Sequence, residues 1–125
     1  MLEAITQADD ALAEAEAQIR AYAARAAADP DLYALQITLA REHPRVRVRR
    51  VEVFFAYEDA LYGRFRRETP TISPVAGRIA ASMVTKLVPA TMEAWLDAGA
   101  PAEGPDWESG LALVRRQVEE LLGRS

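Results

Sequence analysis

The sequence contains no cysteine and has only one histidine, His43. Without cysteine there is no disulfide, no thiolate metal site and no thiol nucleophile. A single histidine leaves a zinc site without a second imidazole, and Ser73 and Ser82 have no paired base for a hydrolytic triad. The sequence therefore predicts that the protein is not an enzyme and that it carries no metal or cofactor.

Long apolar runs and an excess of positive charge are also missing. No apolar run approaches the roughly 20 residues that a membrane span needs, and the first residues lack the basic start and apolar core of a secretion signal. The net charge is −4, whereas a nucleic-acid-binding surface neutralises phosphates with Lys and Arg. We expect a cytoplasmic protein that does not bind membranes and that does not bind DNA through this chain alone.

The residues that are present favour helices. About a fifth of the chain is alanine, which has the highest helix propensity. A length of 125 residues, half of them hydrophobic, corresponds to a single globular domain over residues 1–125. The fold class predicted from composition is all-α.

Apolar residues at intervals of three and four predict five helices. Proline and glycine set their limits, because a residue before proline leaves the helical region and glycine ends helices. Ser73-Pro74 is a typical helix start, with serine as the N-cap and proline at the first position. The expected helices cover residues 2–28, 32–42, 44–68, 74–98 and 107–122.

The third of these helices carries a carboxylate on an apolar stripe. The stripe is Val51, Phe54, Phe55, Glu58, Leu61, Tyr62 and Phe65. Burying a charge without a partner costs on the order of several kcal/mol. Glu58 therefore either reaches solvent or lines a cavity that has polar points on its wall.

We hypothesise a ligand cavity around Glu58, because ligand sites are mostly apolar with a few polar groups that orient the ligand. A buried Glu58 would favour a cationic or hydrogen-bond-donating ligand. Lys86 either pairs with Glu58 or extends to the surface, and ordinary core packing is the alternative for every member of the set. The candidate ligand-binding residues are Tyr33, Gln36, Ile37, Phe54, Tyr57, Glu58, Met83, Lys86 and Met92.

The succession of patterns resembles a known family. The segments DPDLYALQITLAREHPRVRVRR, FFAYEDALYGRF, MEAWLDAG and DWESGLALVRRQVEELL resemble the C-terminal regulatory domain of TetR-family transcriptional repressors of the AcrR-like kind. The resemblance covers essentially the whole chain. It implies a five-helix regulatory domain that binds a small lipophilic or aromatic effector and forms a homodimer. Family members begin with a helix-turn-helix, and nothing in residues 1–125 corresponds to it, so DNA binding is implied only through a domain missing from this chain.

In that family the last two helices of each subunit form a four-helix dimer interface. The resemblance places the interface residues at Val84, Val88, Trp95, Trp107, Leu111, Val114, Val118 and Leu121. The alternative is that the stripe of the last helix packs inside the same chain.

Two other functions stay open. A headless structural or interaction homologue would dimerise without a ligand pocket, and a small helical enzyme would use Glu58 beside Tyr57 in a cleft. The arginines at positions 45, 47, 49 and 50 lack the interleaved aromatic residues of single-strand binders. We interpret them as a solvated face or as a contact with the missing DNA-binding module.

Overall fold

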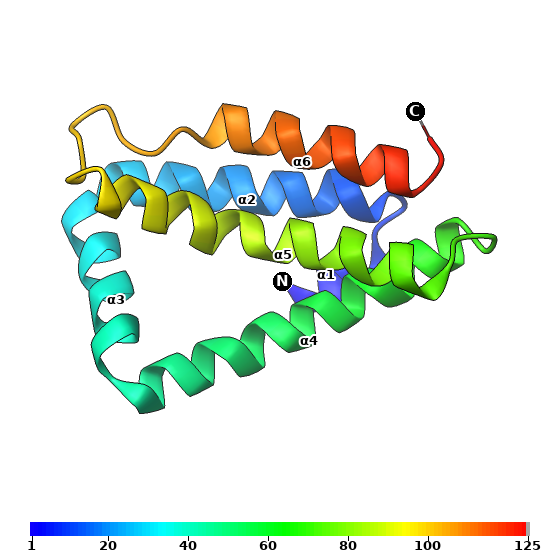
Figure 1. Ribbon diagram of the computed structural model, residues 1–125, viewed down its shortest axis with the longest axis horizontal. Helices are drawn as coiled ribbons and strands as arrows, with labels where there is room; N and C mark the ends of the chain where they lie inside the picture. The colour runs from blue at the N-terminus through cyan, green and yellow to red at the C-terminus, as the bar shows by residue number, and fades with distance from the viewer. Residues whose placement is uncertain (125) are drawn as a thin grey trace.

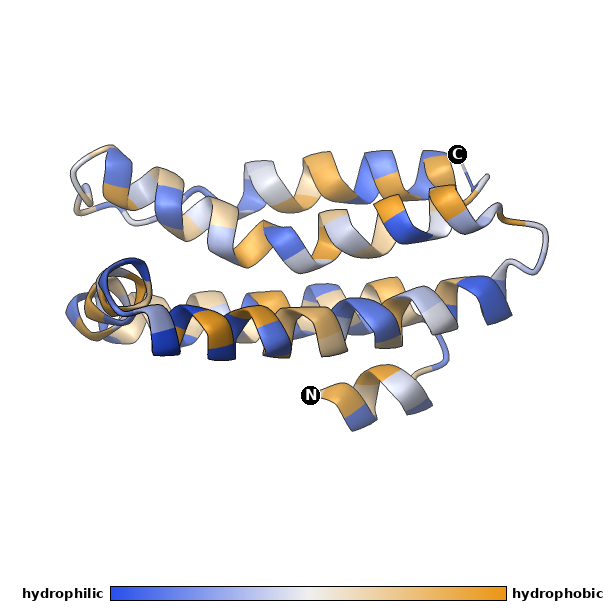
Figure 2. Cartoon of the chain, turned by 60° about the horizontal axis from the view of Figure 1, so that its bottom comes forward, coloured by the Kyte–Doolittle hydropathy of each residue, from blue (hydrophilic) through white to orange (hydrophobic). Residues whose placement is uncertain are grey.

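Six α-helices make up the part of the chain described by a computed structural model, residues 1–124, and this part contains no strand (Figure 1). The all-α prediction is confirmed. Figure 2 shows the helices as two layers, with α5 and α6 above α2 and α4, and with α1 packed below them. The helices are α1 (Leu2–Gln7), α2 (Ala11–Ala28), α3 (Pro30–Glu42), α4 (Pro44–Glu68), α5 (Pro74–Asp97) and α6 (Trp107–Leu121).

The prediction of one continuous helix over residues 2–28 is wrong, because the chain breaks between Gln7 and Ala11. Asp10 begins a new helix: its side chain accepts a hydrogen bond from the backbone N–H of Ala13 at 3.1 Å. Aspartate is among the best N-cap residues because its carboxylate satisfies an otherwise free N–H of the first turn. The break lets α1 turn back and pack against α4.

Two residues of α4 hold both sides of this break. Arg64 donates hydrogen bonds to the carbonyl oxygens of Ile5, at 2.8 Å, and Thr6, at 3.3 Å, near the end of α1. Glu68 accepts from the backbone N–H of Ala11 at 2.9 Å, at the start of α2, and pairs with Arg64 at 3.0 Å. A cation at a helix C-terminus and an anion at a helix N-terminus both complement the helix dipole.

The main core lies between the layers and contains side chains of α1, α2, α4, α5 and α6. Phe65 and Leu61 of α4 are fully buried there. The helices α5 and α6 approach closely at Gly110, where a Cβ atom would lie 2.7 Å from Leu87 Cδ1. The last helix is thus packed inside the chain along one face.

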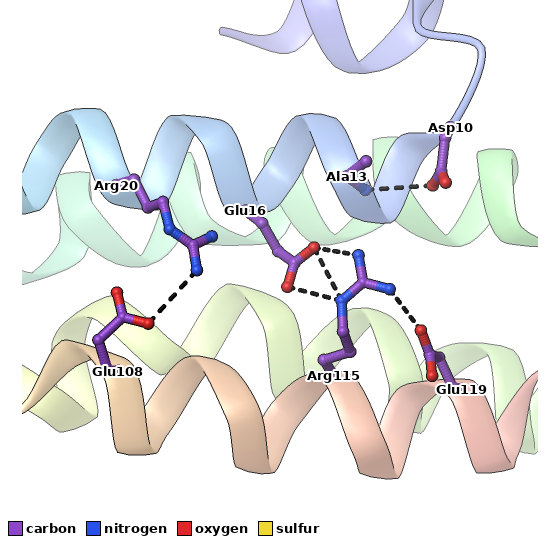
Figure 3. A network of polar contacts seen from close by, with 7 residues as sticks. All are labelled: Asp10, Ala13, Glu16, Arg20, Glu108, Arg115 and Glu119. Atoms are coloured by element: carbon purple, nitrogen blue, oxygen red, sulfur yellow. Dashed lines mark hydrogen bonds and ion pairs between the residues drawn. The ribbon is translucent and has the colours of Figure 1, made fainter. Parts of the chain in front are cut away.

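Ion pairs join α2 to the side of α6 that faces it (Figure 3). The guanidinium of Arg115 binds both carboxylate oxygens of Glu16 and also pairs with Glu119. Arg20 donates to Glu108 at 3.4 Å, about two turns earlier along α6. These contacts cover the α2 side of α6. On its other side α6 packs against α5, with a groove between the two helices. Within residues 1–124, no helix is both long and apolar enough to span a membrane.

Candidate functional site

A cavity of about 490 Å³ lies between α2, α3, α4 and α5, and it is open to solvent on one side. Most of its wall is apolar, and no aspartate or glutamate lines it. The lining residues are Met1, Gln18, Ile19, Tyr22, Arg25, Gln36, Ile37, Leu39, Val46, Arg49, Arg50, Val53, Phe54, Tyr57, Val84, Thr85 and Val88.

A neutral polar pair lies at one end of the cavity. The hydroxyl of Tyr57 donates to Gln18 Oε1 at 3.1 Å, and Gln18 Nε2 donates to the carbonyl oxygen of Met1 at 3.1 Å. Burial, and to a smaller extent the nearby charge of Glu14, together raise the pKa of Tyr57 to about 12. The phenol is therefore uncharged at neutral pH and acts as a hydrogen-bonding group.

The other end of the cavity is cationic. Arg25 of α2 and Arg49 and Arg50 of α4 all line it. The guanidinium carbon of Arg50 lies 5.4 Å from the centre of the Phe54 ring, and that of Arg25 lies 6.0 Å from the centre of the Tyr22 ring. Burial raises the pKa of Tyr22, and the charge of Arg50 offsets part of that rise. At this end of the cavity, positive charges therefore lie next to the aromatic rings of the wall.

The structure places four of the nine predicted ligand-binding residues on this cavity wall: Gln36, Ile37, Phe54 and Tyr57. Tyr33 and Met92 lie in a neighbouring core cluster with Trp95, where the Tyr33 ring meets the Tyr22 ring edge to face at 5.1 Å. Met83 and Lys86 line a different groove, between α5 and α6.

Glu58, on which the prediction was centred, does not line the cavity. The cavity face of α4 follows Val46, Arg50, Val53 and Tyr57, and a residue one position further along points about 100° away from it. Glu58 is half-buried near α5, where its charge contributes to the raised pKa of Arg78 after the larger effect of the Asp59 hydrogen bond. The cavity wall therefore carries no carboxylate, and its lining gives the predicted preference for cations no support.

Sequence reasoning missed the α2 wall and the arginines at the cationic end of the cavity. Gln18, Tyr22 and Arg25 recur at i, i+4 and i+7, which places a polar, an aromatic and a basic residue on one helix face. This pattern was available in the sequence, but Tyr22 also fits the core stripe of a single long helix. That Arg49 and Arg50 line the cavity follows only from the way α4 packs against the other helices.

The predicted dimer-interface residues divide into two groups. Val84, Trp95, Leu111 and Val118 are buried by other parts of the same chain, so they form core in this subunit. The remaining four are half-buried: Val88 lines the cavity, Val114 lines the groove between α5 and α6, and Trp107 and Leu121 pack against the core.

The groove between α5 and α6 has a volume of about 520 Å³ and is more open than the cavity. Its wall combines Met83, Ala90 and Ala94 of α5 with Leu113 and Val114 of α6. Leu113 is 50% exposed. The apolar surface that α5 and α6 leave exposed to solvent is therefore this groove. Most of the predicted interface residues on α6 lie outside it.

Comparison with protein-family models, with curated proteins and with solved structures finds no match. Among residues 1–124, no group of three or more His, Cys, Asp or Glu side chains is placed to hold a metal ion. The chemistry of the site therefore has to be inferred from the cavity itself, which offers an apolar body, a neutral hydrogen-bonding end and a cationic end.

The Tyr57 phenol predicts a specific pH dependence. Its pKa of about 12 exceeds the ordinary value of 10, so the folded state holds this proton more tightly than the unfolded state. The resulting stability is complete below about pH 10 and is lost as the pH rises through about 12. We expect Tyr57→Phe to be less stable than wild type by about 1 kcal/mol near pH 8, since it loses the Gln18 hydrogen bond. Urea unfolding across this range checks the prediction: the difference should shrink above pH 10, and a constant difference would contradict it.

Proposed function

We propose that this chain is the effector-binding and dimerisation domain of a TetR-like transcriptional repressor. The cavity of about 490 Å³ is the observation that carries the proposal, because small-molecule sites typically occupy about 300–1,000 Å³ and have mostly apolar walls. The effector is a small lipophilic or aromatic molecule, and the protein acts in the cytoplasm. A structural homologue with a filled core, the main alternative, would have no such cavity.

The construction of the cavity supports allosteric control. Its walls come from four helices, so a ligand that prefers one arrangement of these helices shifts the population toward that arrangement. Gln18 of the wall also holds the Met1 carbonyl at the start of α1. In the resembled family the DNA-reading module precedes this region, and a small change in the separation of two such modules weakens binding to half-sites at fixed spacing.

Homodimerisation is the second part of the proposal. The surface that supports it is the groove between α5 and α6, whose Met83, Ala90, Leu113 and Val114 present apolar atoms to solvent. Apolar patches of this kind on soluble domains commonly mark protein interfaces. Two copies of the α5–α6 pair facing each other would form a four-helix interface around a two-fold axis.

Thermal unfolding with decan-1-ol and 1-naphthol tests the sensor function. A ligand bound only by the folded state, at about 100 times its Kd, adds about 2.7 kcal/mol and raises the Tm by several degrees. We expect Val53→Trp, which adds a bulky ring to the cavity wall, to abolish most of this rise. The matched control is Val48→Trp on the same helix: Val48 is 56% exposed and Val53 57%, but only Val53 lines the cavity. Equal shifts in both variants, or no shift in wild type, would reject the sensor.

A further inference from the structure

The distribution of charge around the cavity is opposite to that of the whole chain. The chain carries a net charge of −4, yet the cavity is lined by three arginines and by no acidic residue. An arginine guanidinium is always charged at physiological pH and presents a planar fork of N–H donors. One end of the cavity therefore favours negatively charged groups.

These arginines form neither ion pairs nor side-chain hydrogen bonds within residues 1–124. The ion pairs formed within residues 1–124 involve other arginines, namely those at positions 20, 41, 64, 78, 115 and 124. Arg25, Arg49 and Arg50 take no part in them, and no side-chain hydrogen bond of the described residues starts from these three. Arg50 is half-buried beside the Phe54 ring. Its donors thus remain available to a molecule in the cavity.

The helix directions bring these charges together. In Figure 1, α2 and α4 run in opposite senses along the molecule. Along α2 the cavity residues run from Gln18 through Tyr22 to Arg25, and along α4 they run from Arg50 to Tyr57. Opposed directions therefore place the arginines at the α3 side and the Gln18–Tyr57 pair at the other end. The apolar length of the cavity lies between them.

We propose that the effector is an amphipathic carboxylate, with an apolar body between the aromatic walls and its anionic head at Arg49 and Arg50. This assignment rests on the proposed sensor function and narrows its ligand class. Arginine pairs with carboxylate through two parallel charge-assisted hydrogen bonds. No carboxylate lines the cavity, so a cationic head would find no anionic partner there. A phosphate head shares the same chemistry, and the experiment separates the two anions.

Calorimetric titrations of the full chain with four ligands of one chain length test the charge preference: decanoate, decyl phosphate, decan-1-ol and decyltrimethylammonium, all below their micelle concentrations. We expect decanoate to bind at least about tenfold more tightly than decan-1-ol, since one hydrogen bond to a charged group is worth roughly tenfold or more. The cation should bind most weakly. Raising the salt concentration should weaken the binding of decanoate and leave the affinity for decan-1-ol unchanged.

Matched double variants locate the effect. R49Q/R50Q should lose most of the preference for decanoate over decan-1-ol, while R45Q/R47Q should keep it. Both variants remove two positive charges from α4, but Arg45 and Arg47 do not line the cavity. Thermal unfolding of each variant without ligand confirms that it is folded.

The outcomes separate this inference from the sensor proposal. Binding of decanoate and decan-1-ol with equal affinity would overturn the inference and leave an uncharged sensor in place, as would an equal loss of preference in both double variants. Tighter binding of decyl phosphate than of decanoate would overturn the choice of a carboxylate. Binding of none of the four ligands would reject the sensor and the inference together.

Discussion

Arg64→Ala should lower the free energy of unfolding by about 3 kcal/mol, the largest effect of any polar substitution in this chain. Removing one partner of a buried ion pair typically costs about 3–5 kcal/mol, because the other charge stays buried without compensation. Arg64 is 8% exposed, and the side chain of its partner Glu68 is 13% exposed. The value falls at the lower end because Arg124 still reaches Glu68 at 3.0 Å. Urea denaturation followed by circular dichroism measures the loss.

The same substitution should detach α1 more than it loosens the other helices. Arg64 is the residue that satisfies the carbonyl oxygens of Ile5 and Thr6, and α1 is only six residues long. Hydrogen exchange should therefore accelerate first in residues 2–7. Arg67→Ala on the exposed side of α4 is the matched control and should change stability by less than about 0.5 kcal/mol. A loss in Arg64→Ala no larger than in this control would show that the ion pair does not hold the break.

The fate of the first predicted helix shows what periodicity can and cannot give. Ile5, Leu12 and Ile19 fit the spacing of one apolar helix face, and all three are buried. Periodicity did not reveal the break, because a helix cap and a helix interior can share the same apolar spacing. The signal was Asp9-Asp10, a pair of residues that favour caps over helix interiors. Arg64, which binds the carbonyl oxygens beside the break, lies more than fifty residues further along the chain, so no local pattern could identify it.

The cavity shows the same limit for a binding site. Gln36, Ile37, Phe54 and Tyr57 were predicted and lie on its wall, since each belongs to a helix face that is apolar with polar points. Glu58 was misplaced because periodicity fixes which residues share a face but not the rotation of that face toward its neighbours. A step of one residue turns a side chain by about 100°. That rotation separates a cavity wall at Tyr57 from the α4–α5 contact at Glu58.

The cationic end of the cavity could not be predicted from the sequence either. The run at positions 45–50 reads as a uniform basic stretch, yet only Arg49 and Arg50 of its four arginines face the cavity. Their partners in the site, Arg25 and Tyr22, come from α2. The packing of α2 against α4 decides which of these charges line the cavity, and this is a tertiary property that no local pattern contains.

Leu113→Asp should convert the protein from a dimer into a monomer if the groove between α5 and α6 is the interface. Leu113 is 50% exposed and lines that groove, so the subunit itself should tolerate the change. Across a two-fold axis each substitution occurs twice, and an unpaired carboxylate enclosed in an apolar contact costs on the order of several kcal/mol. Each 1.4 kcal/mol weakens association about tenfold, so a dimer should dissociate at micromolar concentration.

Light scattering coupled to size exclusion measures this directly, because the molar mass should fall from twice 13.8 kDa to 13.8 kDa. Leu35→Asp is the matched control: Leu35 is 53% exposed on α3, and it lines neither the groove nor the cavity. It should remain a dimer, with effector-induced stabilisation unchanged. If both variants keep the dimer mass, the subunits associate through another face. If the wild-type chain is a monomer, the groove has no second copy to bind, and the dimerisation part of the proposal is rejected.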